Sequence, residues 1–159
     1  MKQISRRQSL LYLAASILLT PFAGRAAAQG LVTFERSTLT IITKSGRHEF
    51  DVELAISDRQ QSQGLMFRRS LPANAGMLFD YKIPTSISMW MKNTFIPLDM
   101  IFIGADGRII NIAQRTVPQS EATISSRGRA RAVLEVNGST ASGLSIKPGD
   151  RVESPIFKK

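Results

Sequence analysis

Residues 100–112 read MIFIGADGRIINI, and this stretch gives the clearest indication of the fold. Two apolar runs flank Ala105, Asp106 and Gly107, and an Asp-Gly pair between hydrophobic segments favours a tight β-hairpin. Neither run alternates between apolar and polar residues, which is typical of strands that are covered on both faces. We therefore expect both runs to form central strands of a β-rich domain.

The segments around this hairpin also predict strands. Residues 38–43 alternate between apolar and hydroxyl side chains, and residues 50–56 alternate between apolar and mostly acidic ones. A period of two is typical of a strand with one buried face, and the turn signal at residues 44–46 joins the two segments into a hairpin. Further short strands are expected at residues 77–79, 87–92, 132–136 and 151–153.

Short helices complete the predicted elements. Ser57 and Asp58 offer an N-cap to a run of polar residues, and Gly64 suits the position after the last turn of that helix. Residues 137–139 can cap another helical turn that ends at Gly143. Seven or eight short strands with one or two short helices predict an α+β, mainly β fold. Its expected architecture is a compact, partly closed antiparallel barrel-like sheet, because closure removes exposed strand edges.

The beginning of the chain resembles an export signal. Lys2, Arg6 and Arg7 form a basic region, and residues 10–22 form an apolar stretch that is too short to cross a membrane. The small residues at positions 26–28 suit a signal peptidase. The Arg-Arg pair is compatible with either the Sec or the twin-arginine route.

The predicted organisation follows from this signal. Residues 1–28 are expected to be a cleaved signal peptide, residues 29–36 a flexible leader and residues 37–159 a single domain in the periplasm or outside the cell. Without the signal, the chain carries 17 basic and 12 acidic side chains, a net charge of +5. This modest charge does not favour nucleic-acid binding, and membrane contact is expected only during export. We expect a monomer.

The composition excludes several kinds of chemistry. The chain has no cysteine, so it cannot form disulfides, thiolate metal sites or a cysteine nucleophile. His48 is its single histidine, which excludes a metal site with two histidines. It also lacks a phosphate-binding glycine loop and a nucleophile elbow, so no cofactor is expected.

The segment from Trp90 to Asp99 is the strongest candidate for a binding site. In a strand over residues 87–92, Trp90 and Lys92 share one face and could line a cleft with Asn93 and Asp99. An indole face suits a sugar ring or a cation, and the charged groups could bind polar substituents. The alternative is that Trp90 fills the mouth of the barrel while Asp99 accepts hydrogen bonds from the backbone of a turn.

Two further hypotheses about function stay open. Met89 and Met91 would share the other face of that strand, and thioethers are the soft ligands left for Cu(I) in a chain without cysteine. The alternative to a Cu(I) carrier is ordinary core packing. Asp99 and Glu135 could be the paired carboxylates of an envelope hydrolase, although the alternation around Glu135 turns it away from the side of Leu134.

The motifs of the mature chain resemble those of a known family. They are GLMFR at residues 64–68, GMLF at 76–79, WMKNT at 90–94, IPLD at 96–99, IFI at 101–103, DG at 106–107, VLE at 133–135 and GD at 149–150. This series is similar to the DUF192 family, also called UPF0127, which comprises small exported or membrane-associated bacterial and archaeal proteins of unknown function. The resemblance covers about residues 38–157 and implies a single compact β-rich domain, without implying an activity.

The residues therefore favour a binding or accessory protein, and whether the protein is also an enzyme stays open. The expected ligand is a small polar or envelope-derived molecule, or the exposed loop of a protein partner. The residues expected to bind it are Trp90, Lys92, Asn93, Asp99 and Glu135.

Overall fold

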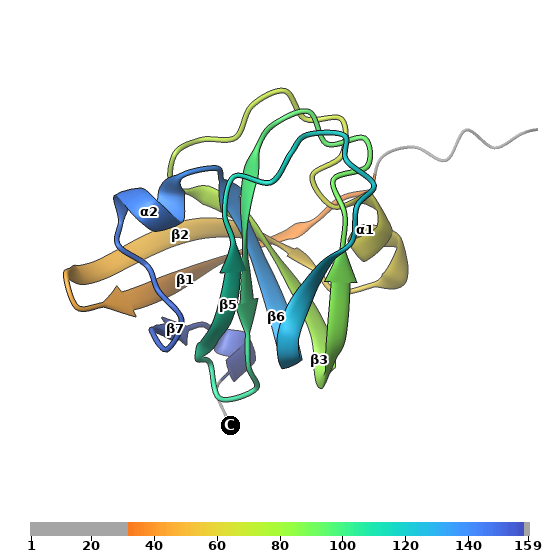
Figure 1. Ribbon diagram of the computed structural model, residues 1–159. Helices are drawn as coiled ribbons and strands as arrows, with labels where there is room; N and C mark the ends of the chain where they lie inside the picture. Colours follow the sequence, from red (N-terminus) through yellow and green to blue (C-terminus); the bar gives the residue numbers. More distant parts are fainter. Residues whose placement is uncertain (1–31, 158–159) are drawn as a thin grey trace, which may run out of the picture. The chain divides into compact units, whose positions relative to one another are not determined.

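Strands dominate the protein, whose computed structural model describes residues 32–157 (Figure 1). The strands are β1 (Glu35–Thr43), β2 (Gly46–Ala55), β3 (Ala75–Met89), β4 (Leu98–Ile103), β5 (Ile109–Ala113), β6 (Ile124–Asn137) and β7 (Arg151–Glu153). The helices are α1 (Asp58–Gln63), α2 (Thr140–Gly143) and the short 3-10 helix η1 (Pro155–Phe157).

The predicted signal peptide, residues 1–28, lies outside the described residues, as do residues 29–31 of the predicted leader. The end of that leader is part of the sheet, because β1 begins at Glu35 and pairs from there with β2. No helix within residues 32–157 is long and apolar enough to span a membrane.

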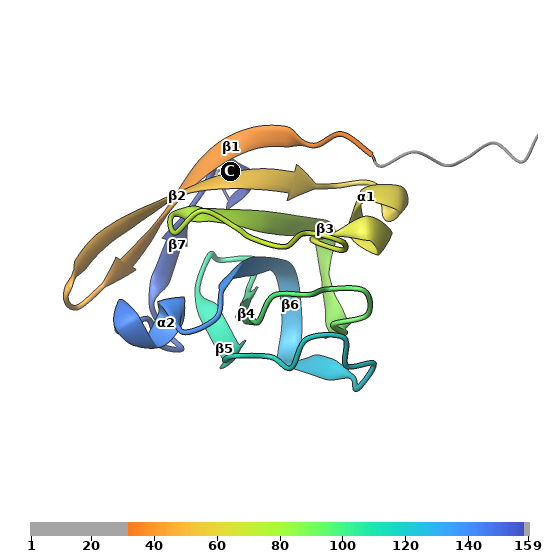
Figure 2. The same cartoon turned by 90° about the horizontal axis from the view of Figure 1, so that it is seen from above.

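The seven strands form a curled sheet in the order β5-β4-β6-β3-β2-β1-β7. Seen from above, β1, β2 and most of β3 lie on one side, and β4, β5 and β6 lie on the other (Figure 2). The two edges approach each other where Arg108 bridges Arg151 and the Val152 N–H donates to the Gly107 carbonyl at 2.7 Å. The predicted mainly β, partly closed barrel-like sheet is confirmed.

One strand pair departs from the expected antiparallel arrangement. β2 and β3 run parallel, whereas the other neighbouring strands of the sheet are antiparallel. The connection between β2 and β3 contains α1 and a loop, which carry the chain back to the end of the sheet where β2 began. This crossover places α1 beside the sheet.

β3 is a single bent strand of 15 residues, where the sequence predicts two separate strands. It pairs with β6 in both halves, and the register shifts between Asp80 and Thr85. Lys82 adopts a left-handed φ of 64° at the bend, and Pro84 lies in this irregular part, where its missing N–H costs no regular ladder bond. The strand ends at Met89, so residues 90–92 are not part of it.

Side chains pack on both faces of the central strands. All six residues of β4 are buried, which confirms that this arm of the predicted hairpin is covered on both faces. The expectation of a central strand is wrong for the other arm, because β5 forms an edge of the sheet and is only partly buried. One hydrophobic cluster includes Leu78, Ile101 and Leu134. A second cluster, on the opposite face of the same strands, includes Met77 and Met100.

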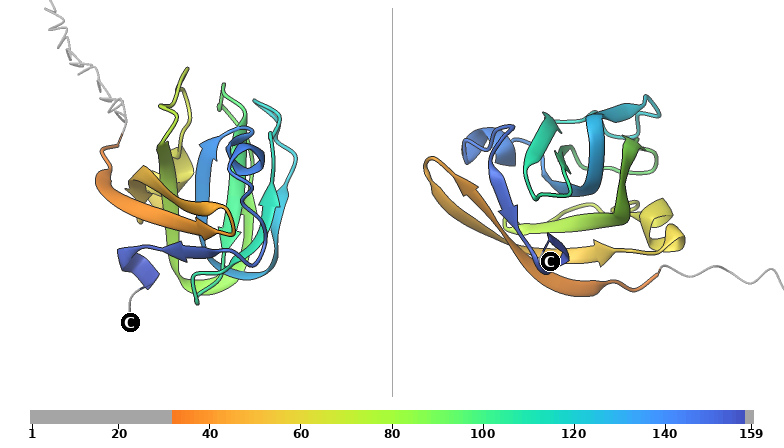
Figure 3. Two further views of the ribbon diagram at one scale, coloured as in Figure 1. Left: turned by 90° about the vertical axis from the view of Figure 1, so that its left-hand side faces the viewer. Right: turned by 90° about the horizontal axis from the view of Figure 1, so that it is seen from below.

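The ends of α1 are fixed by the residues that the sequence suggested. The Ser57 hydroxyl accepts from the Gln60 N–H at 3.3 Å, and the Gln60 side chain accepts from the Ser57 N–H at 3.0 Å, which completes a capping box. Gly64 ends the helix with a φ of 49°. α1 and α2 lie on opposite sides of the domain (Figure 2, Figure 3).

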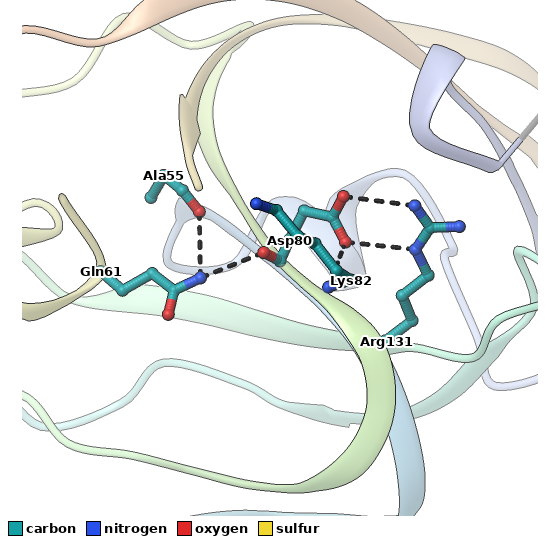
Figure 4. A network of polar contacts seen from close by, with 5 residues as sticks. All are labelled: Ala55, Gln61, Asp80, Lys82 and Arg131. Carbon is teal, nitrogen blue, oxygen red and sulfur yellow. Dashed lines mark hydrogen bonds and ion pairs between the residues drawn. The ribbon is translucent and has the colours of Figure 1, made fainter. Parts of the chain in front are cut away.

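A polar network holds α1 against the sheet (Figure 4). The Gln61 amide donates to the carbonyls of Ala55 at 3.3 Å and Asp80 at 3.1 Å, which ties the helix to β2 and β3. The Asp80 carboxylate in turn accepts from Arg131 at 3.2 and 3.3 Å and from the Lys82 N–H at 2.8 Å. This network fixes the gap between α1 and β3, where the site described below lies.

The close approach of β3 to β6 depends on Gly76. A Cβ at this position would lie 2.7 Å from the Glu135 carbonyl oxygen and 3.1 Å from Val136. We predict that Gly76→Ala lowers the free energy of unfolding by about 2–4 kcal/mol, because backbone atoms must move to relieve the overlap. Urea denaturation followed by circular dichroism measures the change.

Gly143→Ala is the matched control, because nothing lies within 4 Å of the Cβ it would add. Its free energy of unfolding should stay within about 1 kcal/mol of the wild type. Equal stability of the two variants would contradict the role assigned to Gly76.

Candidate functional site

Three of the residues predicted for the site lie together at one end of the domain. Trp90 follows β3 directly, and 48% of its surface is exposed. The Lys92 ammonium lies 5.1 Å from the centroid of the Trp90 ring and 3.5 Å from a carboxylate oxygen of Glu121. Asn93 has a left-handed φ of 54°, and its carbonyl accepts from the Phe67 N–H at 2.9 Å. The loops after α1, β3 and β5 meet here, at the top of Figure 1.

Asp99 does not belong to this group. It lies in β4 with no exposed surface, and its carboxylate accepts from three backbone N–H groups, of Arg115 at 2.7 Å, Ala141 at 2.8 Å and Ser139 at 3.1 Å. The expectation that Asp99 shares a cleft with Trp90 is therefore wrong. The alternative from the sequence holds, because the carboxylate fixes the chain around α2 and the loop after β5.

Glu135 faces the other side of the sheet from Asp99. It lies opposite Met100 of β4 and Met77 of β3, so its side chain points toward the second hydrophobic cluster. Asp99 is the neighbour of Met100 and therefore points to the opposite face. The two carboxyl groups cannot act on one substrate from the same side, which removes the pair on which the hydrolase hypothesis depended.

A small pocket lies between α1 and β3, with a volume of about 100 Å³. Trp90 is its most exposed large side chain, and Glu135, of which 4% is exposed, is its most buried charged residue. The structure therefore brings together Trp90 and Glu135, which are 45 positions apart in the sequence. The lining residues are Gln61, Ser62, Gln63, Gly64, Leu65, Met66, Phe79, Tyr81, Ser88, Met89, Trp90, Thr94 and Glu135.

The Glu135 carboxyl group differs from the other buried carboxyl groups. Asp80 is paired with Arg131, and Asp99 accepts three backbone hydrogen bonds. Within residues 32–157, the Glu135 side chain has neither a hydrogen-bond partner nor an ion-pair partner, and it borders the pocket. A buried carboxylate without a partner is costly, so the fold retains an unfavourable group at this position.

Burial changes the ionisation of two pocket residues. It raises the pKa of Glu135 from 4.5 to about 8, so this carboxyl group is mostly protonated at neutral pH. Burial, and secondarily the nearby Glu135 charge, raises the pKa of Tyr81 to about 12. The Tyr81 hydroxyl donates to the Met89 sulfur at 3.3 Å. The pocket thus presents two neutral hydroxyl-bearing groups at pH 7.

The methionines are divided between the pocket and the core. Met66 and Met89 line the pocket, whereas Met91 has no exposed surface and its sulfur accepts from the Thr116 hydroxyl at 3.1 Å. The Cu(I) hypothesis needed Met89 and Met91 on one strand face, and the strand ends at Met89. Within the described residues, no group of three or more His, Cys, Asp or Glu side chains could hold a metal ion.

Sequence reasoning missed several residues at this end of the domain. Phe79 and Tyr81 lie two positions apart on β3, and treating residues 77–89 as one strand would have placed both beside the predicted site. Phe67 and Phe95 are exposed and contact each other edge to face, with ring centroids 6.4 Å apart. Phe67 has a φ of 67°, which is strained for a bulky residue and carries no sequence signal.

A larger and more open groove of about 740 Å³ runs along β1 and β7. It contains none of the residues predicted for the site. Ser154 lines this groove, and its hydroxyl is buried without a hydrogen-bond partner among residues 32–157. The Ser154 hydroxyl is fully enclosed, whereas the Glu135 carboxyl group borders its pocket, so the pocket at Glu135 is the stronger candidate for a binding site.

The fold and the pocket define a small curled-sheet protein with a pocket of about 100 Å³ beside its first helix. The DUF192 family model, described as Uncharacterized ACR, matches residues 40–154, and the chain belongs to this family. The resemblance inferred from the sequence motifs is thereby confirmed.

Two crystal structures are similar to this chain. One, from Sinorhizobium meliloti 1021 and described as a candidate transcription regulator, is 45% identical, with a TM-score of 0.77 over 80% of this chain and 99% of that one. The other, a protein of unknown function from Novosphingobium aromaticivorans DSM 12444, is 44% identical, with a TM-score of 0.75 over 84% of this chain and 98% of that one. The search of the curated proteins found no match.

The network around Asp99 leads to a prediction about stability. Asp99→Asn replaces an acceptor oxygen with an NH₂ group that faces backbone N–H donors. We expect the free energy of unfolding to fall by about 2–4 kcal/mol. Asp106→Asn is the control, because Asp106 is exposed and accepts from the Arg108 N–H at 3.1 Å, and it should cost less than about 1 kcal/mol. Similar losses in both variants would refute the role of Asp99.

The buried acid leads to a prediction about pH. Because its pKa is about 8 in the folded chain and 4.5 ordinarily, the folded state keeps a proton that the unfolded state loses between these values. Stability contributed by this residue therefore falls as pH rises from about 4.5 to about 8 and then levels off.

Glu135→Gln removes this titration and nearly preserves the shape of the side chain. The variant should match the wild type within about 1 kcal/mol at pH 4.5 and exceed it by several kcal/mol, on the order of 5, at pH 9. Urea denaturation of both proteins at the two pH values measures this difference. A difference that does not change with pH would show that Glu135 titrates normally.

Proposed function

We propose that this protein is an exported binding protein and that its pocket receives the end group of a small polar ligand. The observation that carries the proposal is the Glu135 carboxyl group, which is buried, borders the pocket and has no partner within residues 32–157. A ligand that hydrogen-bonds to this group would offset the cost of burying it.

The size of the pocket limits what enters it. A volume of about 100 Å³ corresponds to roughly three water molecules of the liquid, so it holds one functional group with a few carbon atoms. The rest of a larger ligand would lie across the half-exposed Trp90 ring. The Lys92–Glu121 ion pair beside this ring offers both a donor and an acceptor. An aromatic face next to polar groups suits a sugar or an amino sugar of the cell envelope.

The pocket residues favour binding over hydrolysis. Glu135 is the single carboxyl group in the lining, whereas hydrolysis of a glycosidic bond by the usual route needs two carboxyl groups that flank the bond. The Thr94 hydroxyl, another lining group, donates to the Lys92 carbonyl at 3.3 Å. No histidine lies in the lining to activate a nucleophile.

Export is supported by the sequence. The basic residues Lys2, Arg6 and Arg7, the apolar stretch at 10–22 and the small residues at 26–28 follow the order of a secretory signal. The domain would then act in the periplasm or outside the cell, where envelope-derived molecules are available.

A fluorescence screen tests the binding proposal. Trp90 is the only tryptophan of the chain and lies at the pocket, so its emission reports ligands that enter. The panel contains N-acetylglucosamine, glucosamine, D-alanine, diaminopimelic acid, glycerol and 1-butanol. We expect at least one compound to bind, with an affinity that falls at least tenfold in Glu135→Gln.

Asp106→Asn is the control, because this exposed carboxylate lies in the turn between β4 and β5 and is not part of the pocket lining. It should change the affinity less than threefold. Absence of any response across the panel, or equal binding by the wild type and Glu135→Gln, would overturn the proposal.

A further inference from the structure

We propose that the end group recognised by this pocket is a primary alkylammonium, which Glu135 binds as a carboxylate. This inference rests on the proposed function and specifies the chemistry of the ligand. It is carried by the composition of the pocket wall, by the pairing of the cations nearby and by the size of the cavity.

The pocket wall is electron-rich. Phe79, Tyr81 and Trp90 contribute aromatic rings, and Met66 and Met89 contribute thioether sulfurs. Ring faces attract cations through their quadrupoles, and sulfur is a weak acceptor. None of the thirteen lining residues is Lys, Arg or His, so no basic side chain in the wall would bind an anion.

The cations near this end of the domain have other partners. Lys92 lies over the Trp90 ring and beside Glu121. Arg131 pairs with Asp80, and Arg68 pairs with Glu53 through two hydrogen bonds of 2.7 and 2.8 Å. Within residues 32–157, Glu135 therefore has no cation of its own, although each other carboxylate buried against the sheet has donors. A positively charged ligand would supply the missing one.

The acceptors around the pocket match a primary ammonium. This group has three N–H donors, and Glu135 can offer two carboxylate oxygens. The Tyr81 hydroxyl donates its proton to the Met89 sulfur, and the Thr94 hydroxyl donates its proton to the Lys92 carbonyl. The oxygens of both hydroxyls therefore keep lone pairs for a further donor. The volume of about 100 Å³ admits an ammonium with its first methylene groups.

Binding of such a cation must release a proton. The Glu135 carboxyl group enters the reaction protonated and leaves it as a carboxylate, and the ammonium keeps its three protons, so one proton passes to the solvent for each ligand bound. Tyr81 is the other titratable group of the lining; the lining residues from α1, from residues 64–66 and from Thr94 carry none. Because burial raises the pKa of Glu135 to about 8, affinity should rise with pH up to about that value.

The test compares n-butylammonium with 1-butanol, which has a similar size and no charge. Trp90 fluorescence gives the affinities at pH 6, 7 and 8, and calorimetry in buffers of different ionisation enthalpy gives the number of protons released. We expect n-butylammonium to bind at least tenfold more tightly than 1-butanol at pH 7. Its affinity should rise roughly tenfold from pH 6 to pH 7, with close to one proton released.

Variants test whether the binding of n-butylammonium depends on Glu135. Glu135→Gln should weaken n-butylammonium at least tenfold and leave 1-butanol within threefold, whereas Asp106→Asn, outside the pocket, should change neither by more than threefold. Tetramethylammonium, which has no N–H donor, should bind at least tenfold more weakly than n-butylammonium.

Three outcomes with the wild-type protein would overturn the inference: equal binding of n-butylammonium and 1-butanol, an affinity for n-butylammonium that does not change with pH, or tetramethylammonium binding as tightly as n-butylammonium. These comparisons decide the inference even if a variant fails to fold. In each of these cases, any compound of the panel whose affinity falls at least tenfold in Glu135→Gln would still support the proposed function. If no compound binds, both proposals fail.

Discussion

The packing of side chains on both faces of β3, β4 and β6 is the constraint on which the rest of this structure depends. Residues 76–80 of β3, 98–103 of β4 and 132–136 of β6 are all buried, and their side chains alternate between two hydrophobic clusters, so a polar residue in these stretches has no solvent-facing side on which to lie. Asp99 and Glu135 lie in this region with their side chains on opposite faces. The Asp99 carboxylate is surrounded by backbone N–H groups that it holds in place, and it therefore stabilises the fold.

Glu135 is also buried in this doubly covered region, but its burial destabilises the fold. Its carboxyl group is buried to a similar extent and receives no donor from residues 32–157, so its burial costs stability at neutral and alkaline pH. Groups that destabilise a fold and border a pocket are common at binding sites, where the ligand supplies the missing interaction. The two carboxyl groups thus illustrate how one sheet can contain both a structural acid and a candidate ligand-binding acid.

The site also depends on the parallel connection between β2 and β3. Because this connection needs a crossover, it contains α1, and the Gln61 side chain holds that helix against β2 and β3. The same connection supplies residues 61–66 to the wall of the pocket. A tight hairpin in place of this crossover would have left Glu135 without a cover on that side. The topology therefore creates both the burial of Glu135 and the opening beside it.

The sequence by itself determined the fold class, the family and the covered nature of residues 100–103, because alternation, turn residues and motif order are local properties of the chain. It also selected Trp90 and Glu135 as candidate residues. Only the tertiary structure decided that these two meet, that Asp99 points away from them and that residues 75–89 form one bent strand. The reason is physical: which face of a strand is covered, and which buried carboxyl group receives a donor, depends on segments that are distant in sequence.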